Sequence, residues 1–78
     1  MSFGKALEAL KEGKKVTRRG WNGKGMWVIS VEESEVSYRG IGRVKLNQFF
    51  VIKNVNNSFS AWVPSINDCN ADDWLIVE

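Results

Sequence analysis

The run Met-Trp-Val-Ile-Ser-Val over residues 26–31 constrains the fold of this chain more than any other stretch. Its β-branched and aromatic residues predict a strand that is apolar on both faces, and such a strand needs a cover on both sides. The chain has only 78 residues, and a domain of that length buries about 60% of its unfolded surface. One helix can cover one face, so we expect a second copy of the chain to cover the other.

A helix is predicted over residues 3–12. Apolar side chains recur there with the spacing of one buried stripe, at Phe3, Ala6, Leu7 and Leu10. Ser2 precedes the stripe and is a good N-cap, and Gly13 follows it as a residue that ends a helix. This helix is the predicted cover for one face of the strand.

The remaining apolar runs predict short strands, at residues 16–18, 49–53, 59–63 and 74–77. Asparagines at 54–57 supply a turn, Pro64 ends a strand, and Ser65 caps a short helical turn. We expect an α+β fold in one domain, residues 1–78, with one N-terminal helix packed on a small antiparallel sheet. Residues 32–45 predict no strand: a solvated turn precedes a mobile loop over residues 38–43.

Composition excludes several classes of function. The chain has no histidine and one cysteine, Cys69, so neither a His general base nor a Cys/His metal site can be built. A net charge of +2 is too weak to argue for a DNA- or RNA-binding face. No apolar run is long enough for a membrane span, and we expect a reduced, cytoplasmic protein without a bound metal or cofactor.

A glycine-rich stretch, residues 18–27, carries the strongest functional signal. It combines two tryptophans, three cations and three glycines, which offer flat stacking faces, phosphate donors and accessible backbone N–H groups. This composition suits a nucleotide-like anion. The alternative is a tight turn between two strands, with Trp21 and Trp27 filling the core.

Two further groups can carry chemistry. Asp68, Asp72 and Asp73 can act as acid and base or hold a divalent cation, although the first two fit turn caps and Asp73 fits a site better. Arg39 and Arg43 flank glycines and can close over an anion, or they can belong to an exposed connection.

Motifs at both ends of the chain resemble the second family of Thoeris anti-defence proteins, small phage and prophage proteins. The matching residues are Phe3, Gly4, Ala6, Leu7, Leu10 and Gly13, then Arg19-Gly20-Trp21-Asn22-Gly23-Lys24, then Trp62, Pro64, Ser65, Asp68, Ala71, Asp73 and Trp74. The resemblance covers about two-thirds of the chain. Residues 32–58 contribute nothing to it.

The resemblance implies a sponge that binds a glycocyclic ADP-ribose, the signal of a bacterial TIR-domain defence protein, without cleaving it. It also implies a homotetramer, a dimer of dimers, with ligand pockets between protomers. Trp21, Asn22, Gly23 and Trp27 match the family's pocket motif, and Asp73 and Trp74 match its second motif. From their chemistry, Arg19 and Lys24 would bind the diphosphate, Asp73 would accept from ribose hydroxyls, and Met26 would line the pocket.

Three other functions compete with the sponge. The chain can be an enzyme that cleaves the nucleotide with Asp72 or Asp73 as base, a single-stranded nucleic-acid binder with tryptophan platforms, or a protein-interaction module. The missing histidine and the modest charge favour the sponge over the first two.

Overall fold

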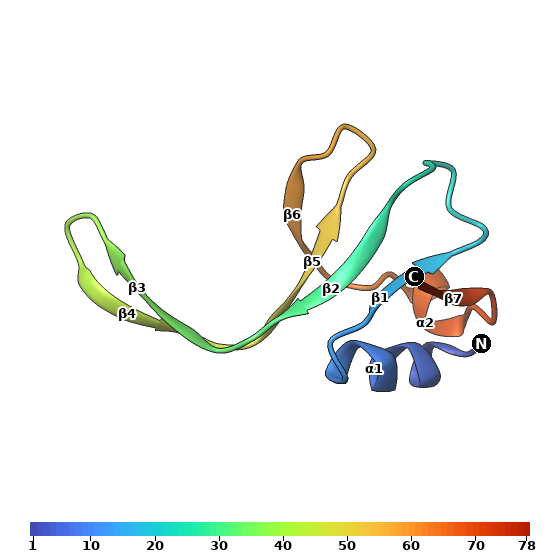
Figure 1. Cartoon of the computed structure of the whole chain (residues 1–78), viewed down its shortest axis with the longest axis horizontal. Coiled ribbons are helices and arrows are strands. Elements are labelled where there is room, and N and C mark those ends of the chain that lie inside the picture. Colours follow the sequence, from blue (N-terminus) through green and yellow to red (C-terminus); the bar gives the residue numbers. More distant parts are fainter.

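The computed structural model describes residues 1–78 and shows an α+β fold with a protruding arm (Figure 1). The order along the chain is α1 Phe3–Lys11, β1 Lys15–Arg18, β2 Trp27–Val31, β3 Ser34–Tyr38, β4 Gly42–Leu46, β5 Phe49–Lys53, β6 Phe59–Trp62, α2 Ile66–Asn70 and β7 Trp74–Val77. Five strands form one antiparallel sheet in the order β6-β5-β2-β1-β7, and β3 pairs only with β4. The predicted fold class is confirmed.

Helix α1 begins and ends where its sequence signals predict, within one residue. The Ser2 hydroxyl accepts a hydrogen bond from the Lys5 N–H at 3.3 Å, and Gly13 takes a left-handed φ of 84° after the last turn. Ala6 and Leu10 are buried as expected, and Ala9 between them is buried too. The helix therefore presents a wider apolar face to the sheet than the predicted stripe.

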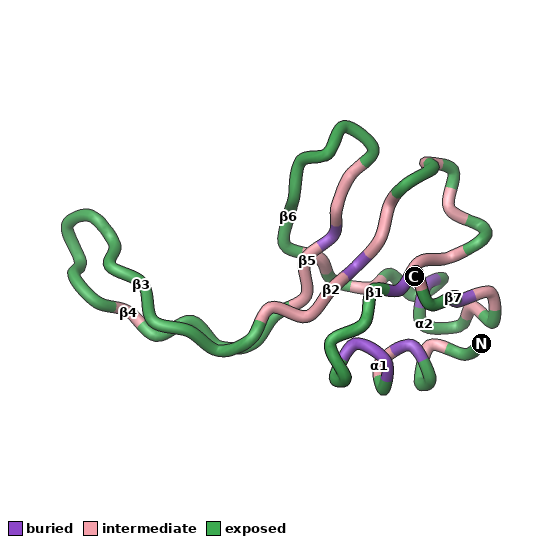
Figure 2. Tube along the Cα trace, viewed as in Figure 1, coloured by how far each residue is buried: buried purple, intermediate pink, exposed green.

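The core lies between α1 and one face of the sheet (Figure 2). Val16, Val28 and Ile52 face one another across three neighbouring strands, and each is buried. Trp74 joins them from the edge strand β7 with no exposed surface. One face of the predicted two-faced strand is thus covered by the helix.

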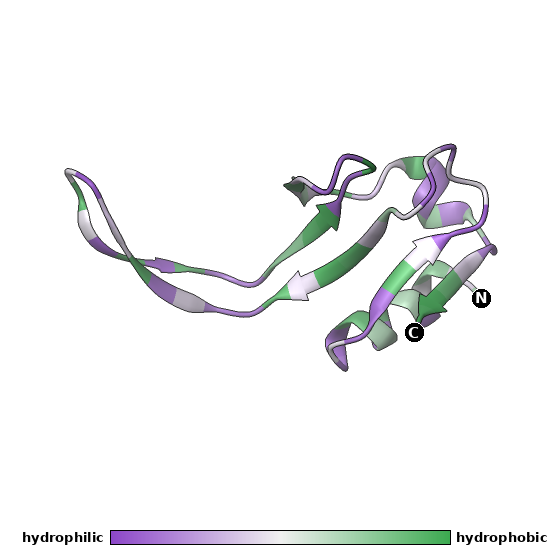
Figure 3. Cartoon of the chain, turned by 45° about the horizontal axis from the view of Figure 1, so that its top comes forward, coloured by the Kyte–Doolittle hydropathy of each residue, from purple (hydrophilic) through white to green (hydrophobic).

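The opposite face of the sheet has no cover within the chain; we call it the open face. Its apolar residues alternate with the buried ones along the strands, and none of them is buried: Trp27, Ile29, Val31, Phe49, Val51, Phe59 and Leu75. Figure 3 shows the hydrophobic colouring along β2 and β5. The second half of the cover predicted for this strand is absent from the single chain.

The prediction for residues 32–45 was wrong, because these residues form most of a two-stranded arm, β3 and β4 (Figure 1). The arm continues the β2–β5 pairing without a slip: Val31 faces Phe49, and three residues further along each strand Ser34 faces Leu46. Its turn is closed by the Ile41 N–H, which donates to the Tyr38 carbonyl at 3.0 Å.

One side of the arm is apolar and the other is charged. Val36 faces Val44 on the first side, next to Tyr38 and Leu46, while Glu33–Lys45 and Glu35–Arg43 ion pairs line the second. Because charged residues alternate with the apolar ones along β3 and β4, the sequence of these strands predicted a solvated segment. All arm residues except Val44 are exposed.

The C-terminal elements follow their predicted signals. Asn57 adopts a φ of 68° in the turn between β5 and β6, and Ser65 caps α2 after Pro64. Strand β7 then pairs with β1 at the edge of the sheet. No helix has both the length and the hydropathy needed to cross a bilayer.

Candidate functional site

The glycine-rich loop, residues 19–26, connects β1 to β2 and is closed at its base. The Thr17 hydroxyl donates to the Met26 carbonyl oxygen at 2.7 Å. Inside the loop, Gly25 takes a φ of 77°, which favours glycine. A Cβ on Gly23 would lie 2.5 Å from side-chain atoms of Met26 and Val55, so this glycine allows close packing. Specific hydrogen bonds and side-chain contacts therefore hold the loop in place.

An ion-paired network anchors the beginning of this loop to the C-terminal segment. Arg18 Nε donates to Asp73 Oδ1 at 2.8 Å, and Arg18 Nη1 donates to Asp68 Oδ1 at 2.8 Å. The second Asp73 oxygen accepts from the Gly20 N–H at 2.8 Å. Hydrogen bonds from Arg18 and then from Gly20 hold the pKa of Asp73 below its usual value, although desolvation opposes this shift. Asp73 therefore stays ionised and fixes the Gly20 backbone.

Asp68 is the buried acid of the network. Its second oxygen accepts from the Ser65 N–H at 2.9 Å, while its own N–H donates to the Ser65 hydroxyl, so the two residues form a capping box for α2. Desolvation raises the pKa of Asp68, but hydrogen bonds from Ser65, Arg18 and Trp21 outweigh it and leave the pKa lowered. The predicted turn-capping role of Asp68 is confirmed, and its ion pair with Arg18 was not predicted.

The side chain of Trp21 points from the loop toward the core and packs there against two other tryptophans. Its ring meets that of Trp74 at a centroid distance of 5.4 Å and that of Trp62 at 6.3 Å, both edge-on. Its indole N–H donates to Asp68 Oδ1 at 3.2 Å, yet the side chain remains partly exposed. Trp21 thus joins the core while offering some ring surface at the loop.

Trp27 lies on the other face of the sheet. It precedes the buried Val28, so its ring belongs to the open face, where it meets Phe59 edge-on at 5.7 Å. The Lys15 ammonium lies 5.0 Å from its ring centroid. The sequence suggested that Trp21 and Trp27 flank one site, but a single chain separates them by the thickness of the sheet.

The two cations of the loop are free. Arg19 and Lys24 are exposed and form no salt bridge, and Asn22 between them is exposed as well. Trp74 differs from these residues: it has no exposed surface, and its indole N–H donates to the Asp68 carbonyl at 3.0 Å. Of the predicted site residues, Trp74 lies in the core beneath the loop.

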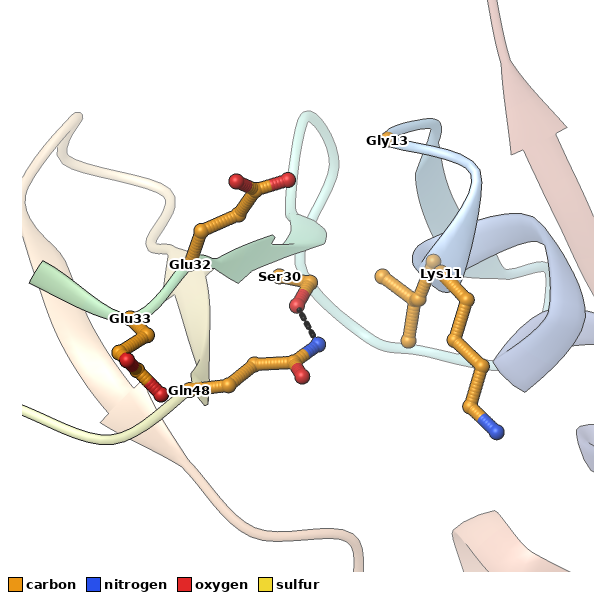
Figure 4. Close-up of a pocket in the computed structure, with 7 residues that line it drawn as sticks. Lys11, Gly13, Ser30, Glu32, Glu33 and Gln48 are labelled. Atoms are coloured by element: carbon orange, nitrogen blue, oxygen red, sulfur yellow. Dashed lines mark hydrogen bonds between the residues drawn. The ribbon is translucent and has the colours of Figure 1, made fainter.

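Most residues of the loop line no cavity of the single chain. Met26 alone reaches one, a shallow hollow of about 460 Å³ shared with the β5–β6 turn. Another, of about 380 Å³, lies between the end of α1 and the start of the arm; Figure 4 shows Glu32, Glu33 and Lys11 at its wall and the Gln48–Ser30 hydrogen bond. An enclosed nucleotide pocket at the loop is therefore not formed by one chain alone.

Sequence reasoning missed the anchoring role of Arg18 and Asp68. The sequence predicted that Ser65 and Asp68 cap turns, and their spacing, Ser65-x-x-Asp68, is that of a capping box. No local pattern, however, indicates that Arg18 reaches 50 residues along the chain to the same carboxylate. The predicted arginine pair, Arg39 and Arg43, lies on the arm and away from the loop (Figure 1). Arg43 pairs with Glu35 there, and Arg39 lies at the arm's turn.

Comparison with known proteins places the chain in a family. The model of the Tad2-like family, described as a Thoeris anti-defense 2-like domain, matches residues 1–77. The chain is also 42% identical, over 84 aligned residues, to Thoeris anti-defense 2 of Bacillus phage SP01; the match covers 99% of this chain and 94% of that relative. The chain therefore belongs to the Thoeris anti-defense 2-like family.

Proposed function

We propose that this protein is a phage anti-defence sponge, which binds a cyclic ADP-ribose-type signal, glycocyclic ADP-ribose, in the host cytoplasm and holds it intact. Family membership across residues 1–77, together with the name of its 42% identical relative, carries this proposal. Sequestering the signal would block Thoeris defence without any contact with the defence proteins themselves.

The chemistry of the loop supports an anionic, ring-bearing ligand. Arg19 and Lys24 are exposed cations without partners, and charge-assisted hydrogen bonds to a diphosphate are stronger than neutral ones. Trp21 offers ring surface beside them, and Asn22 an exposed amide. We assign these residues, with Gly23, Met26 and Trp27, to the ligand site, and Asp73 to holding the loop and accepting from ribose hydroxyls with its remaining lone pairs.

A second copy of the chain completes the site in this proposal. The open face exposes an apolar surface around Trp27, Ile29 and Val51, and such surfaces mark protein–protein contacts. The loop of one chain borders a cavity only at Met26, in a shallow hollow shared with the β5–β6 turn, so a pocket between protomers fits the geometry. The assembly we propose is a homotetramer, built as a dimer of dimers.

Storage suits the acidic residues better than cleavage does. A general base needs a pKa near the working pH, whereas the pKa of Asp73 is lowered, first by its hydrogen bond with Arg18. Asp68 is buried and held by three donors. Both carboxylates therefore act as fixed acceptors in the proposed function.

The test is binding followed by recovery of the ligand. Calorimetry with purified glycocyclic ADP-ribose should give saturable binding, and heating the complex should release the full amount unchanged by chromatography. Loss of ligand beyond one equivalent per site would mean turnover and favour an Asp73-dependent enzyme. Absence of binding, with single-stranded RNA shifted at low salt, would favour a nucleic-acid binder.

A further inference from the structure

The indole of Trp21 is restrained by three separate contacts. Its N–H donates to Asp68 Oδ1 at 3.2 Å, and its ring meets the rings of Trp74 and Trp62 at 79° and 68°. The side chain is only partly exposed. A ligand at the loop therefore meets a ring whose orientation is already set, and whose N–H is already used.

Asp68 is the fixed point of these contacts. Its side chain is almost fully buried, and the same carboxylate accepts from Arg18 at 2.8 Å and from the Ser65 N–H at 2.9 Å. The bond to Ser65 ties the carboxylate to the start of α2. Arg18 then extends the restraint to Asp73, which accepts from the Gly20 N–H.

We infer that Asp68 is a positioning residue for ligand binding, which orients the Trp21 indole and, through Arg18 and Asp73, fixes the start of the glycine-rich loop. This inference rests on the proposed function, and it adds a residue that does not touch the ligand. A side chain held in its bound orientation loses less freedom when the ligand arrives, so the restraint increases affinity.

An amide cannot replace the carboxylate at this position. The Asp68 side chain accepts hydrogen bonds from three donors, on Ser65, Arg18 and Trp21, and donates none. Asparagine has one acceptor oxygen and an NH₂ donor, so in either orientation its NH₂ faces another donor. Asp68→Asn is therefore a small change in shape that disrupts the restraint.

The first experiment measures affinity for glycocyclic ADP-ribose by calorimetry. Asp68→Asn should weaken binding about tenfold, the value of a lost charge-assisted hydrogen bond. Ser65→Ala is the matched control: it removes the hydroxyl that caps α2 but keeps the carboxylate, and it should bind like the parent. Unchanged binding by Asp68→Asn, or an equal loss in Ser65→Ala, would overturn the inference.

A double-mutant cycle separates positioning from a general loss of stability. Trp21→Phe keeps a ring but lacks the N–H, so the link to Asp68 is already broken in this variant. Adding Asp68→Asn to Trp21→Phe should then cost much less than tenfold. A full further tenfold loss would show that Asp68 acts only through Arg18 and Asp73, and it would reject the role of Asp68 in orienting Trp21.

A second readout needs no ligand. The four tryptophans give four indole N–H signals in a nitrogen-15 spectrum, and Trp21→Phe identifies one by its loss. The Trp74 signal monitors α2, because that indole donates to the Asp68 carbonyl. In Asp68→Asn the Trp21 signal should shift and exchange faster with water, while that of Trp74 stays.

The two readouts fail in different ways. A parent protein that does not bind glycocyclic ADP-ribose rejects the proposed function and, with it, the role of Asp68 in binding. A parent that binds, combined with an unmoved Trp21 signal in Asp68→Asn, rejects the positioning role alone. Equal movement of the Trp21 and Trp74 signals also rejects it, because Asp68 would then only support α2.

Discussion

Thr17 Oγ1 donates a hydrogen bond of 2.7 Å to the carbonyl oxygen of Met26, and this contact joins the two ends of the glycine-rich loop. Thr17→Val keeps the shape of the side chain but removes the donor. We expect it to lower the free energy of unfolding by about 1 kcal/mol, the usual net value of such a bond. Urea unfolding measures the change, and Thr17→Ser should retain most of the stability. A loss in Thr17→Ser with none in Thr17→Val would instead point to the methyl group.

Two glycine-to-alanine substitutions should act with opposite signs. Gly4 lies in the first turn of α1, where a Cβ meets only the Ser2 hydroxyl at 3.7 Å, so alanine should stabilise the protein by about 1 kcal/mol. Gly25 has a φ of 77°, so alanine there should destabilise it by about 1 kcal/mol. Thermal unfolding compares the pair. A stabilising Gly25→Ala would mean that the loop relaxes to another conformation.

Stability should fall in acid because of Asp68 and Asp73. Both pKa values lie below the ordinary 3.8 in the folded chain, so the unfolded state binds protons more readily. The stabilisation is complete above this value and is lost as the pH falls through the folded pKa values. Urea unfolding at pH 7 and pH 3 should show that the free energy of unfolding falls less in acid for Asp73→Asn than for Asp72→Asn. Asp72 is the control because its carboxylate forms no salt bridge.

The free cations of the loop should set the salt dependence of ligand binding. Arg19→Gln and Lys24→Gln should each weaken binding of glycocyclic ADP-ribose and reduce its sensitivity to salt, because each removes a charge near the diphosphate. Lys5→Gln, on the solvent side of α1, is the control and should leave binding unchanged. Calorimetry at two salt concentrations decides. If both loop variants bind the ligand as the parent does, the diphosphate does not bind at this loop.

The open face should be an interface between copies of the chain. Val51 lies on it at the centre of β5, opposite Ile29, and points away from α1. Val51→Lys should therefore yield a folded protein of lower mass than the parent, which should scatter light as a tetramer. Asn56→Lys, in the exposed β5–β6 turn, should leave the assembly intact. A monomeric parent at micromolar concentration would reject the proposed assembly.

Elements with strong local signals were predictable from the sequence. Ser2 and Gly13 bracket α1, and the turn at Asn57 separates β5 from β6, because each depends on a few neighbouring residues. The arm was missed because its Val36–Val44 side alternates with the charged side, and two exposed strands lack the continuous apolar signal of β2. Its pairing depends on the register inherited from β2 and β5.

The candidate site was predictable in composition but not in arrangement. The loop stood out in the sequence by its cations, glycines and tryptophans, and in the structure Arg19 and Lys24 are exposed and Trp21 is partly exposed. The separation of Trp21 from Trp27 by the sheet depends on where the loop ends and the alternation of β2 begins. The contacts of Arg18 with Asp68 and Asp73 join residues at least 50 positions apart, which no local pattern encodes.

The unbroken register from Trp27 opposite Lys53 to Tyr38 opposite Gly42 limits how such an arm can change length. Removing one residue from β3 alone would force either a bulge or a one-residue slip in register. The slip would move the apolar side chains of β3 to the charged side of the arm. Removing two facing pairs, such as Val36–Val44 with Ser37–Arg43, would shorten the arm and keep each remaining side chain on its side. Tolerated insertions and deletions are therefore expected to come in matched, even steps on both strands.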